Sequence, residues 1–294
     1  MQKYSIKIMA LNCSFAIDIN EECFHDLKRS KVILDQALAI EEKYEIIINN
    51  YIELEQQVTN EAIKNMTTSH FEPDDIFNTI LALNVKLVNL LSSCYLYYCQ
   101  VPRSVRECLC EPDALKVVNG LFSHEYDNNL NYRFMYELRN HLQHNGLAVH
   151  CGNIHKKWKG NYDILEYSFS FFAEKSECLL NEKFKKKILN ELPDKIDLHS
   201  ASRSYIESIS NVHEQIRNMI QEVVDKSRVT IETAMDNFKE KYPDKNLYFL
   251  SACSYDDKDL VQEISLSLDW DDIRKKLLMR NKRLGSLGKS RLIS

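Results

Sequence analysis

Two long stretches of helical periodicity, with few residues to interrupt them, most constrain how this chain can fold. In the first, over about 22–66, apolar residues recur at helical spacing; they include Leu34, Leu38, Ile47, Tyr51, Leu54, Val58 and Ala62. The second runs over about 201–242 and is followed by Pro243. The 294 residues contain only six glycines and five prolines, the residues that most often end helices. The sequence therefore predicts a mainly α protein.

Shorter helical patterns complete the predicted helical body. They cover about 74–99, 112–121, 129–145, 181–190 and 269–284. The first of these carries an apolar stripe and should end before Pro102, because proline removes a backbone donor and clashes with the preceding turn. The helix over 129–145 should end at Gly146, the residue type favoured at a helix C-terminal cap.

Three segments have the texture of β structure. A short strand is expected near 4–11, and NLYFLSACS (246–254) is expected as a final strand. Between them, GLAVH and YDILEYSFSFF alternate, with KKWKGN connecting them, which predicts a small hairpin near 147–173. We see no internal repeat or low-complexity linker. We therefore expect residues 1–200 to form a helical bundle carrying the hairpin, and residues 201–294 a C-terminal helical extension packed on the same body.

Charge and cysteine content narrow the class of protein. The formal net charge of −5 argues against a protein that coats nucleic acid, so a polyanion would bind a local basic patch. The nine cysteines, an odd number without Cys-x-x-Cys, suit reduced thiols in the cytosol. The first residues lack the pattern of a signal peptide, and no stretch reaches the roughly 18 apolar residues of a membrane span. We expect a soluble, cytoplasmic protein with no membrane partner.

The end of the helix over 129–145 carries an unusual set of polar groups. Arg139, Asn140, His141 and His144 lie within six residues, just before Gly146. Arginine offers a permanent cation with a planar donor fork suited to phosphate. Histidine takes and gives protons near neutral pH, and asparagine supplies a neutral donor and acceptor. Cleaving RNA without a metal requires such groups, to deprotonate the ribose 2′-OH, stabilise the transition state and protonate the leaving 5′ oxygen.

Helical spacing groups these side chains. Asn140 and His144 are four residues apart and His141 and His144 three apart, so they share one face, and Glu137 shares it with His141. Arg139 and His144 are five apart, about 140° around an ideal helix, and flank that face. Two such helices facing each other across a two-fold axis would bring two arginines and two histidines to one cleft.

This motif resembles that of a known superfamily. Arg139-Asn140-x-x-x-His144 resembles the R-x(4–6)-H motif of HEPN-domain proteins in its RN-x-x-x-H form. The surrounding YRFMYELRNHLQHNGL (132–147) is similar to a group of bacterial HEPN-like proteins. The resemblance implies a HEPN-like antiparallel helical bundle with extra C-terminal helices and a small β element. Members with this motif are typically metal-independent endoribonucleases that act as homodimers with a composite site, and many serve as toxins or anti-phage defence effectors.

The resemblance implies a role for each matching residue. Arg139 would bind and stabilise the scissile phosphate, His144 would be the general acid or base, and Asn140 would orient the phosphate or His144. His141 and Glu137 are possible auxiliary residues. The expected reaction is attack of the 2′-OH on the adjacent phosphorus, giving 2′,3′-cyclic phosphate and 5′-OH ends, with no cofactor or metal. The alternative is a non-catalytic HEPN-like interaction or sensor module.

Partners follow from the same expectation. The substrate would be RNA, and an antitoxin or other regulatory partner would control the activity. KKWKGN places a tryptophan among lysines, so Lys156, Lys157 and Trp158 are candidates for RNA contact through charge and base stacking.

The motif also admits two simpler interpretations. Basic residues are common near a helix C-terminus because the helix dipole favours them there, so Arg139 and His144 could be ordinary end residues. A zinc site is the second alternative, because His141, His144, His150, Cys151 and His155 cluster within 15 residues. Their spacings match no usual zinc finger.

Overall fold

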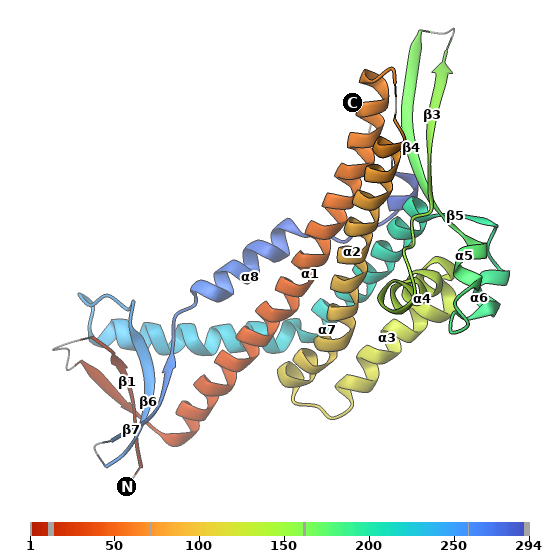
Figure 1. The fold of residues 1–294 in the computed structure, drawn as a ribbon. Helices are drawn as coiled ribbons and strands as arrows, with labels where there is room; N and C mark the ends of the chain where they lie inside the picture. The colour runs from red at the N-terminus through yellow and green to blue at the C-terminus, as the bar shows by residue number, and fades with distance from the viewer. Residues whose placement is uncertain (1, 11–14, 71, 161–162, 258, 291–294) are drawn as a thin grey trace. The chain divides into compact units, whose positions relative to one another are not determined.

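The protein is mainly helical, as expected (Figure 1). The computed structural model describes residues 2–10, 15–70, 72–160, 163–257 and 259–290. The three longest helices are α1 (Glu21–Thr67), α2 (Pro73–Leu109) and α7 (Leu198–Lys241). Shorter helices are α3 (Ala114–Asn128), α4 (Leu130–His144), α5 (Lys175–Leu179), α6 (Lys186–Asn190) and α8 (Asp269–Arg280), and Leu287–Lys289 forms a short 3-10 helix.

Helix α2 does not end at Pro102, and that expectation is wrong. The helix continues for two turns, to Leu109. A proline inside a helix costs roughly 3 kcal/mol through a lost hydrogen bond and a clash. The continuation buries Val105 and Cys108 completely. Burying one such apolar side chain contributes roughly 1.5–3 kcal/mol, so two of them offset the proline.

Helix α4 begins and ends near the expected residues, but its cap differs from the expected one. At the start, the Asn129 side chain accepts a hydrogen bond from the Tyr132 N–H at 3.2 Å. At the end, the N–H groups of Asn145 and Gly146 both donate to the His141 carbonyl, at 2.8 and 3.3 Å. Gly146 lies outside the left-handed region, so the expected glycine cap is wrong. The shared carbonyl satisfies both donors without it.

The chain forms two compact units, each assembled from separate segments. The first contains residues 1–42, 100–118 and 215–282, and the second contains residues 43–99, 119–214 and 283–294. Helices α1, α2 and α7 each contribute residues to both units. The division expected at residue 200 falls inside α7 and inside the second unit.

The first unit contains a four-stranded antiparallel sheet in the order β2-β1-β6-β7. Its strands are β1 (Gln2–Ile8), β2 (Ala16–Ile19), β6 (Leu250–Asp256) and β7 (Asp259–Ser265). The strand expected near 4–11 corresponds to β1, although Leu11 lies outside the described residues. The strand expected at 246–254 is β6, and it is not the final one, because β7 pairs with it. Strand β7 is exposed along most of its length, so it lacks the alternation that identifies half-buried strands.

The second unit is built on the C-terminal part of α1, the N-terminal part of α2 and the start of α7. Leu54, Leu83 and Leu87 are fully buried in its core. Polar contacts also join the helices. Thr79 of α2 donates to Glu61 of α1 at 2.8 Å, and Arg203 of α7 donates twice to Glu55 of α1 at 2.7 Å.

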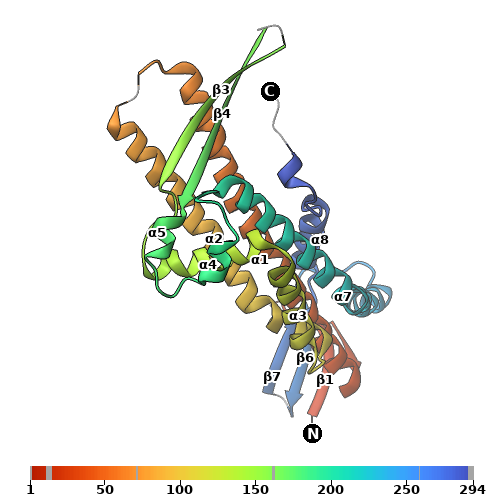
Figure 2. The same ribbon diagram turned by 90° about the vertical axis from the view of Figure 1, so that its right-hand side faces the viewer.

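A three-stranded antiparallel sheet in the order β3-β4-β5 completes the second unit. Its strands are β3 (Cys151–Lys159), β4 (Ile164–Glu174) and β5 (Lys195–Asp197). Figures 1 and 2 show the β3–β4 hairpin beside the C-terminal part of α1 and the N-terminal part of α2. The hairpin lies in the expected region, but its first strand does not.

The expected strand GLAVH is irregular, and KKWK, expected in the connection, belongs to β3. A buried side chain explains the first error. Asn84 of α2 accepts hydrogen bonds from the N–H groups of Ala148 and Val149, both at 3.0 Å, and donates to the Val149 carbonyl at 3.1 Å. These are the backbone groups that strand pairing would have used.

Among the described residues, α2 is the one helix long and apolar enough to cross a membrane by length and composition alone. This test concerns mean hydropathy over a window, whereas the expectation concerned a stretch of roughly 18 apolar residues. A buried core helix has the same composition, and Leu83, Leu87 and Leu90 of α2 are core residues. The composition of α2 is accordingly weak evidence for a membrane span.

Candidate functional site

Helix α4 divides the residues of the motif between two environments. Glu137 and His141 are 6% and 5% exposed and pack into the second unit. Arg139 and Asn140 are half-buried, and His144 is exposed. The expectation that one polar face would carry His141 together with Asn140 and His144 therefore holds only for the last two. Side chains accessible to a ligand are Arg139, Asn140 and His144.

Arg139 is held by two neighbours. Its guanidinium carbon lies 3.4 Å from the centroid of the Tyr95 ring of α2, a cation–π contact. Its Nη1 donates to the Asn140 side-chain oxygen at 3.0 Å. Its Nε is buried and has no hydrogen-bond partner among the described residues. Arg139 thus has a fixed plane, with Nη2 left available to an anion.

Asn140 and His144 lie one helical turn apart. Asn140 contacts Arg139, so in this structure it orients the cation and not the histidine. Within the part of the chain that the structure describes, His144 makes no hydrogen bond or ion pair, to Arg139 or to any other residue. One chain therefore holds Arg139 ready for an anion and leaves the ring nitrogens of His144 open.

His141 belongs to the interior. Its Nδ1 lies 3.3 Å from the Asn181 side-chain nitrogen, and its ring is 6.2 Å from the Phe184 ring, centroid to centroid. Burial lowers its pKa, because desolvation disfavours the imidazolium. A neutral imidazole accepting from Asn181 fits these contacts. The geometry gives His141 a packing role.

Glu137 is also engaged inside the unit. Its Oε1 accepts from the Lys185 ammonium at 2.8 Å and from the Tyr126 hydroxyl at 3.1 Å. Lys185 donates to the same Tyr126 hydroxyl at 2.7 Å. These three residues link α4 to α3 and to the segment before α6. Glu137 has no contact with Arg139 or His144 in this arrangement, and its partners are structural ones.

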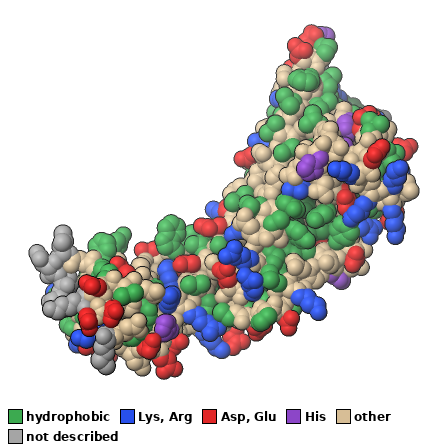
Figure 3. Space-filling model, turned by 60° about the horizontal axis from the view of Figure 1, so that its bottom comes forward, with side chains coloured by type: hydrophobic (Ala, Val, Ile, Leu, Met, Phe, Trp, Pro, Cys, Tyr) green, Lys and Arg blue, Asp and Glu red, His purple; other side chains and the backbone are tan. Residues whose placement is uncertain are grey.

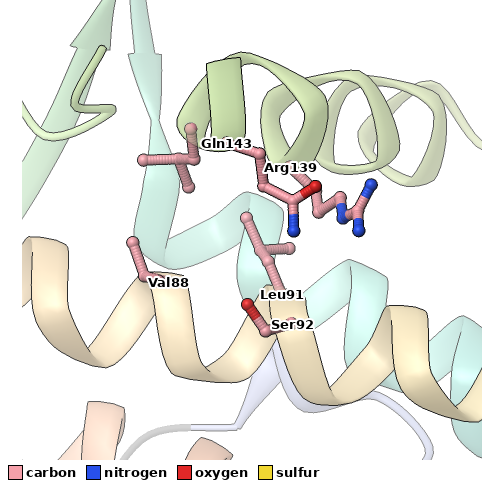
Figure 4. Close-up of a pocket in the computed structure, with 6 residues that line it drawn as sticks. Val88, Leu91, Ser92, Arg139 and Gln143 are labelled. Atoms are coloured by element: carbon pink, nitrogen blue, oxygen red, sulfur yellow. The ribbon is translucent and has the colours of Figure 1, made fainter. Parts of the chain in front are cut away.

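The space beside Arg139 is small. A cavity of about 20 Å³ lies between α2 and α4, lined by Val88, Leu91, Ser92, Arg139, Leu142 and Gln143. Figure 4 shows Gln143 extending from α4 toward the Leu91 side chain of α2, with Arg139 beside it on α4. A space of this size holds about one water molecule. A phosphodiester would not be enclosed by one chain at this place.

An exposed apolar stripe runs along α2 to this cavity. It consists of Phe77, Leu81, Val85, Val88 and Leu96, which are 65%, 43%, 49%, 37% and 38% exposed. Their spacing of three, four and eight residues keeps them on one side of the helix. Exposed apolar side chains along one side of a helix are the kind of surface through which proteins associate.

Lys156, Lys157 and Trp158 lie on β3, in the hairpin and not on α4. Lys156 and Trp158 share one face of the strand and Lys157 lies on the other, because side chains alternate. The Lys156 ammonium is 5.4 Å from the Tyr167 ring centroid on β4, and Trp158 is 51% exposed. All three are accessible, and their strand pairs with β4, so the structure does not bring them together with Arg139 or His144.

The zinc alternative finds no geometric support. Among the described residues, no group of three or more His, Cys, Asp or Glu side chains could hold a metal ion. His150 Nδ1 accepts from the Glu174 N–H at 2.9 Å, so this ring nitrogen has a backbone partner. His141 is turned toward Asn181 and His144 is exposed. The five histidines and cysteines that cluster in the sequence are therefore dispersed in the fold.

Sequence reasoning missed an aromatic cluster beside the motif. Tyr95, which holds Arg139, packs 6.1 Å from Tyr98, and Tyr98 packs 5.9 Å from Tyr136 of α4. Tyr136 in turn packs 5.7 Å from Tyr126 of α3. Of tyrosines 95, 97 and 98 of α2, only Tyr97 is fully buried. Tyr95 and Tyr98 are three residues apart on one helix, and this spacing is the sequence signal that could have indicated the cluster.

Surface charge is consistent with local binding of an anion. On the face of the molecule in Figure 3, Lys and Arg side chains are interspersed with Asp and Glu side chains. With a net charge of −5, attraction of a polyanion depends on individual cations.

Comparison with known proteins gives no further guide to the site. No family model matches the chain, and no curated protein or solved structure matches it. A function must therefore be inferred from the residues and geometry of α4 and its neighbours.

Proposed function

We propose that this chain is a HEPN-like, metal-independent endoribonuclease. The reaction is attack of a ribose 2′-OH on the adjacent phosphorus, with loss of the 5′ oxygen, giving 2′,3′-cyclic phosphate and 5′-OH ends. The observation that carries the proposal is the sorting of side chains on α4. Arg139, Asn140 and His144 are accessible, whereas Glu137 and His141 are buried among partners of their own.

Each accessible residue has a chemical role. The Arg139 guanidinium stabilises the negative charge that builds on the non-bridging oxygens in the transition state. Asn140 holds that guanidinium through its side-chain oxygen. His144 removes the proton from the 2′-OH or supplies one to the leaving 5′ oxygen, and its exposed ring is accessible to a bound RNA. One histidine per chain leaves the other proton transfer to a second copy.

A homodimer with a composite site supplies what one chain lacks. The 20 Å³ cavity beside Arg139 is too small for a phosphodiester. The apolar stripe on α2 leads to that cavity and would lie at the seam between two copies. A two-fold axis near the end of α4 would bring a second Arg139 and a second His144 to the same cleft.

The wider context is proposed from the motif alone. The chain would act in the cytoplasm as a toxin or anti-phage effector, controlled by an antitoxin or another regulatory partner. Lys156, Lys157 and Trp158 on the β3–β4 hairpin would hold RNA outside the cleavage site, through charge and stacking on the half-exposed indole.

The direct test is cleavage of a labelled mixed RNA in EDTA by wild-type protein and by Arg139→Ala and His144→Ala. Matched controls are Arg103→Ala, whose side chain is 77% exposed, and His155→Ala on β3. Cleavage with cyclic-phosphate ends by wild type and both controls, lost in both motif variants, would support the proposal. Equal cleavage by all five proteins would overturn it.

The composite site has its own test. Mixing wild-type protein with an excess of His144→Ala places most wild-type chains in heterodimers, whose cleft holds one histidine. If one site takes a histidine from each copy, the activity per wild-type chain falls well below that of wild-type protein alone. Unchanged activity per wild-type chain, with exchange of subunits verified by labelled protein, would contradict a shared site.

A non-catalytic interaction module is the second candidate. It is favoured by the engagement of Arg139, whose guanidinium is already stacked on Tyr95 and bonded to Asn140. Such an arginine could be a structural residue. This candidate predicts that Arg139→Ala lowers thermal stability, and that wild-type protein leaves RNA intact even with its genomic neighbours added.

A further inference from the structure

An open cavity of about 330 Å³ lies on the second unit, lined mainly by aromatic side chains. The aromatic lining residues are Tyr98, Phe122, Tyr126, Tyr132 and Tyr136, and the polar ones are Ser123, Asp127 and Lys185. They come from α2, α3, α4 and the segment before α6. A volume of this size lies at the lower end of the range for small-molecule sites. Neither the RN-x-x-x-H motif nor the roles derived from it include this cavity.

The rings of the cavity meet edge to face. Tyr98 packs against Phe122 at 5.1 Å and 74°, and Tyr126 packs against Tyr136 at 5.7 Å and 88°. Such pairs rigidify each other, so the walls are preorganised. A flat aromatic ligand could stack on these rings without first ordering them.

Three hydroxyl groups of the cavity lack protein partners. Within the described part of the chain, the hydroxyls of Tyr98, Tyr132 and Tyr136 make no hydrogen bond. Tyr132 is only 2% exposed, but its hydroxyl is not among the fully buried atoms without a partner, so it opens to the cavity. A ligand with a polar edge would bind this hydroxyl in place of solvent.

Lys185 adds one cationic donor at the rim. An ammonium has three N–H donors. Two are directed to Glu137 and to the Tyr126 hydroxyl, at 2.8 and 2.7 Å. The third remains for an anionic or carbonyl oxygen. Because Glu137 fixes the ammonium, that donor is preorganised too.

We propose that this cavity binds a nucleobase. A base has the planar π-face that the tyrosines favour, the polar edge that their hydroxyls need, and in a nucleotide a phosphate for Lys185. The base could belong to RNA or to a free mononucleotide. Binding of a base that belongs to RNA rests on the proposed function. It is favoured because Tyr95 contacts both Arg139 of the candidate site and Tyr98 of the cavity. A base in the cavity would then neighbour the phosphate at Arg139.

The test measures binding without cleavage. All proteins carry His144→Ala, so that bound RNA is not cut. Binding of a short labelled RNA is followed by fluorescence anisotropy, and binding of AMP, GMP, CMP and UMP by calorimetry. The cavity variant is Tyr126→Leu, which removes a stacking face but stays apolar. Tyr126→Phe keeps the face, and Tyr248→Leu, at a tyrosine 71% exposed in the first unit, is the matched control.

The expected result is a roughly tenfold weaker affinity for RNA in Tyr126→Leu, a smaller change in Tyr126→Phe and none in Tyr248→Leu. Mononucleotide binding lost in Tyr126→Leu, with no RNA bound by any of these proteins and no RNA cleaved by protein that retains His144, would support a free nucleotide as the ligand while overturning the ribonuclease. RNA bound equally by Tyr126→Leu, and cleaved by otherwise wild-type protein, would overturn the cavity and keep the ribonuclease. Binding of neither probe would overturn the inference.

Discussion

The guanidinium carbon of Arg139 lies 3.4 Å from the centroid of the Tyr95 ring, while Asn140 accepts from its Nη1 at 3.0 Å. The two contacts restrain the cation. A donor fork held in advance loses less entropy when it binds a phosphate, and it needs no reorganisation as charge develops. Tyr95 is therefore a positioning residue in the proposed reaction.

Replacing Tyr95 should weaken catalysis without removing it. We expect Tyr95→Leu to lower kcat/KM for RNA roughly tenfold, the equivalent of a cation–π contact of about 1.4 kcal/mol. Tyr95→Phe keeps the ring and should stay within about twofold of wild type. Steady-state cleavage of a labelled RNA measures both. A loss as large in the phenylalanine variant would mean that the hydroxyl, and not the ring face, supports Arg139.

The stripe on α2 predicts the oligomeric state. Leu81→Glu and Val85→Glu place a charge on exposed apolar positions, which a free helix tolerates and a buried seam does not. Wild-type protein should sediment as a dimer, and the double variant as a folded monomer that no longer cleaves RNA. The control is Val229→Glu, at a residue 58% exposed in the first unit, which should leave the dimer intact. A dimer that survives the double variant would place the seam elsewhere.

The helices could be predicted from the sequence because their cause is local. Apolar spacing located α1, α4 and α7 to within a few residues. Where tertiary contacts decide, local reasoning failed. The helix past Pro102 depends on burial of Val105 and Cys108, and the irregular segment at Ala148 and Val149 depends on Asn84, more than 60 residues away.

In the candidate site, too, features with a local cause could be predicted and features set by tertiary contacts could not. Helical spacing correctly related Asn140 to His144, since both are accessible on the last turns of α4. It could not show that His141 faces Asn181, because that contact crosses 40 residues of chain. The aromatic cavity combines residues 98, 122–136 and 185, and no single segment carries enough of it to be recognised.

Lys185 should matter for stability as well as for binding. Glu137 is buried, with its side chain 7% exposed, and Lys185 is its cationic partner. In Lys185→Met the carboxylate keeps only the Tyr126 hydroxyl, so we expect a loss of roughly 1–3 kcal/mol in the free energy of unfolding. Adding Glu137→Gln should recover part of that loss, because no unpaired charge remains. Chemical denaturation of the two single variants and the double variant measures the coupling.

Lys183→Met is the control for this cycle, since Lys183 is exposed and two residues away. It should change the free energy of unfolding by less than about 0.5 kcal/mol. A double variant as unstable as the sum of the single ones would show that Lys185 and Glu137 act independently.

Glu55 should make the second unit sensitive to acid. Its burial raises the pKa, but hydrogen bonds from Arg203 and His199 outweigh desolvation and lower the pKa from 4.5 to about 2. The folded state thus binds the proton less tightly than the unfolded state, so this contribution is complete above about pH 4.5 and is lost as the pH falls toward 2. We expect Glu55→Gln to lower the free energy of unfolding by about 2–3 kcal/mol at pH 7, because Arg203 loses its charged partner, and to flatten the acid limb of the stability curve.

The control is Glu53→Gln, on the same helix as Glu55. It removes an exposed ion pair between Glu53 and Lys86 of α2 and should lower the free energy of unfolding by less than about 1 kcal/mol. Urea denaturation of the three proteins between pH 7 and pH 2 makes the comparison, and parallel curves for wild type and Glu55→Gln would show that the Arg203 pair does not carry the acid sensitivity.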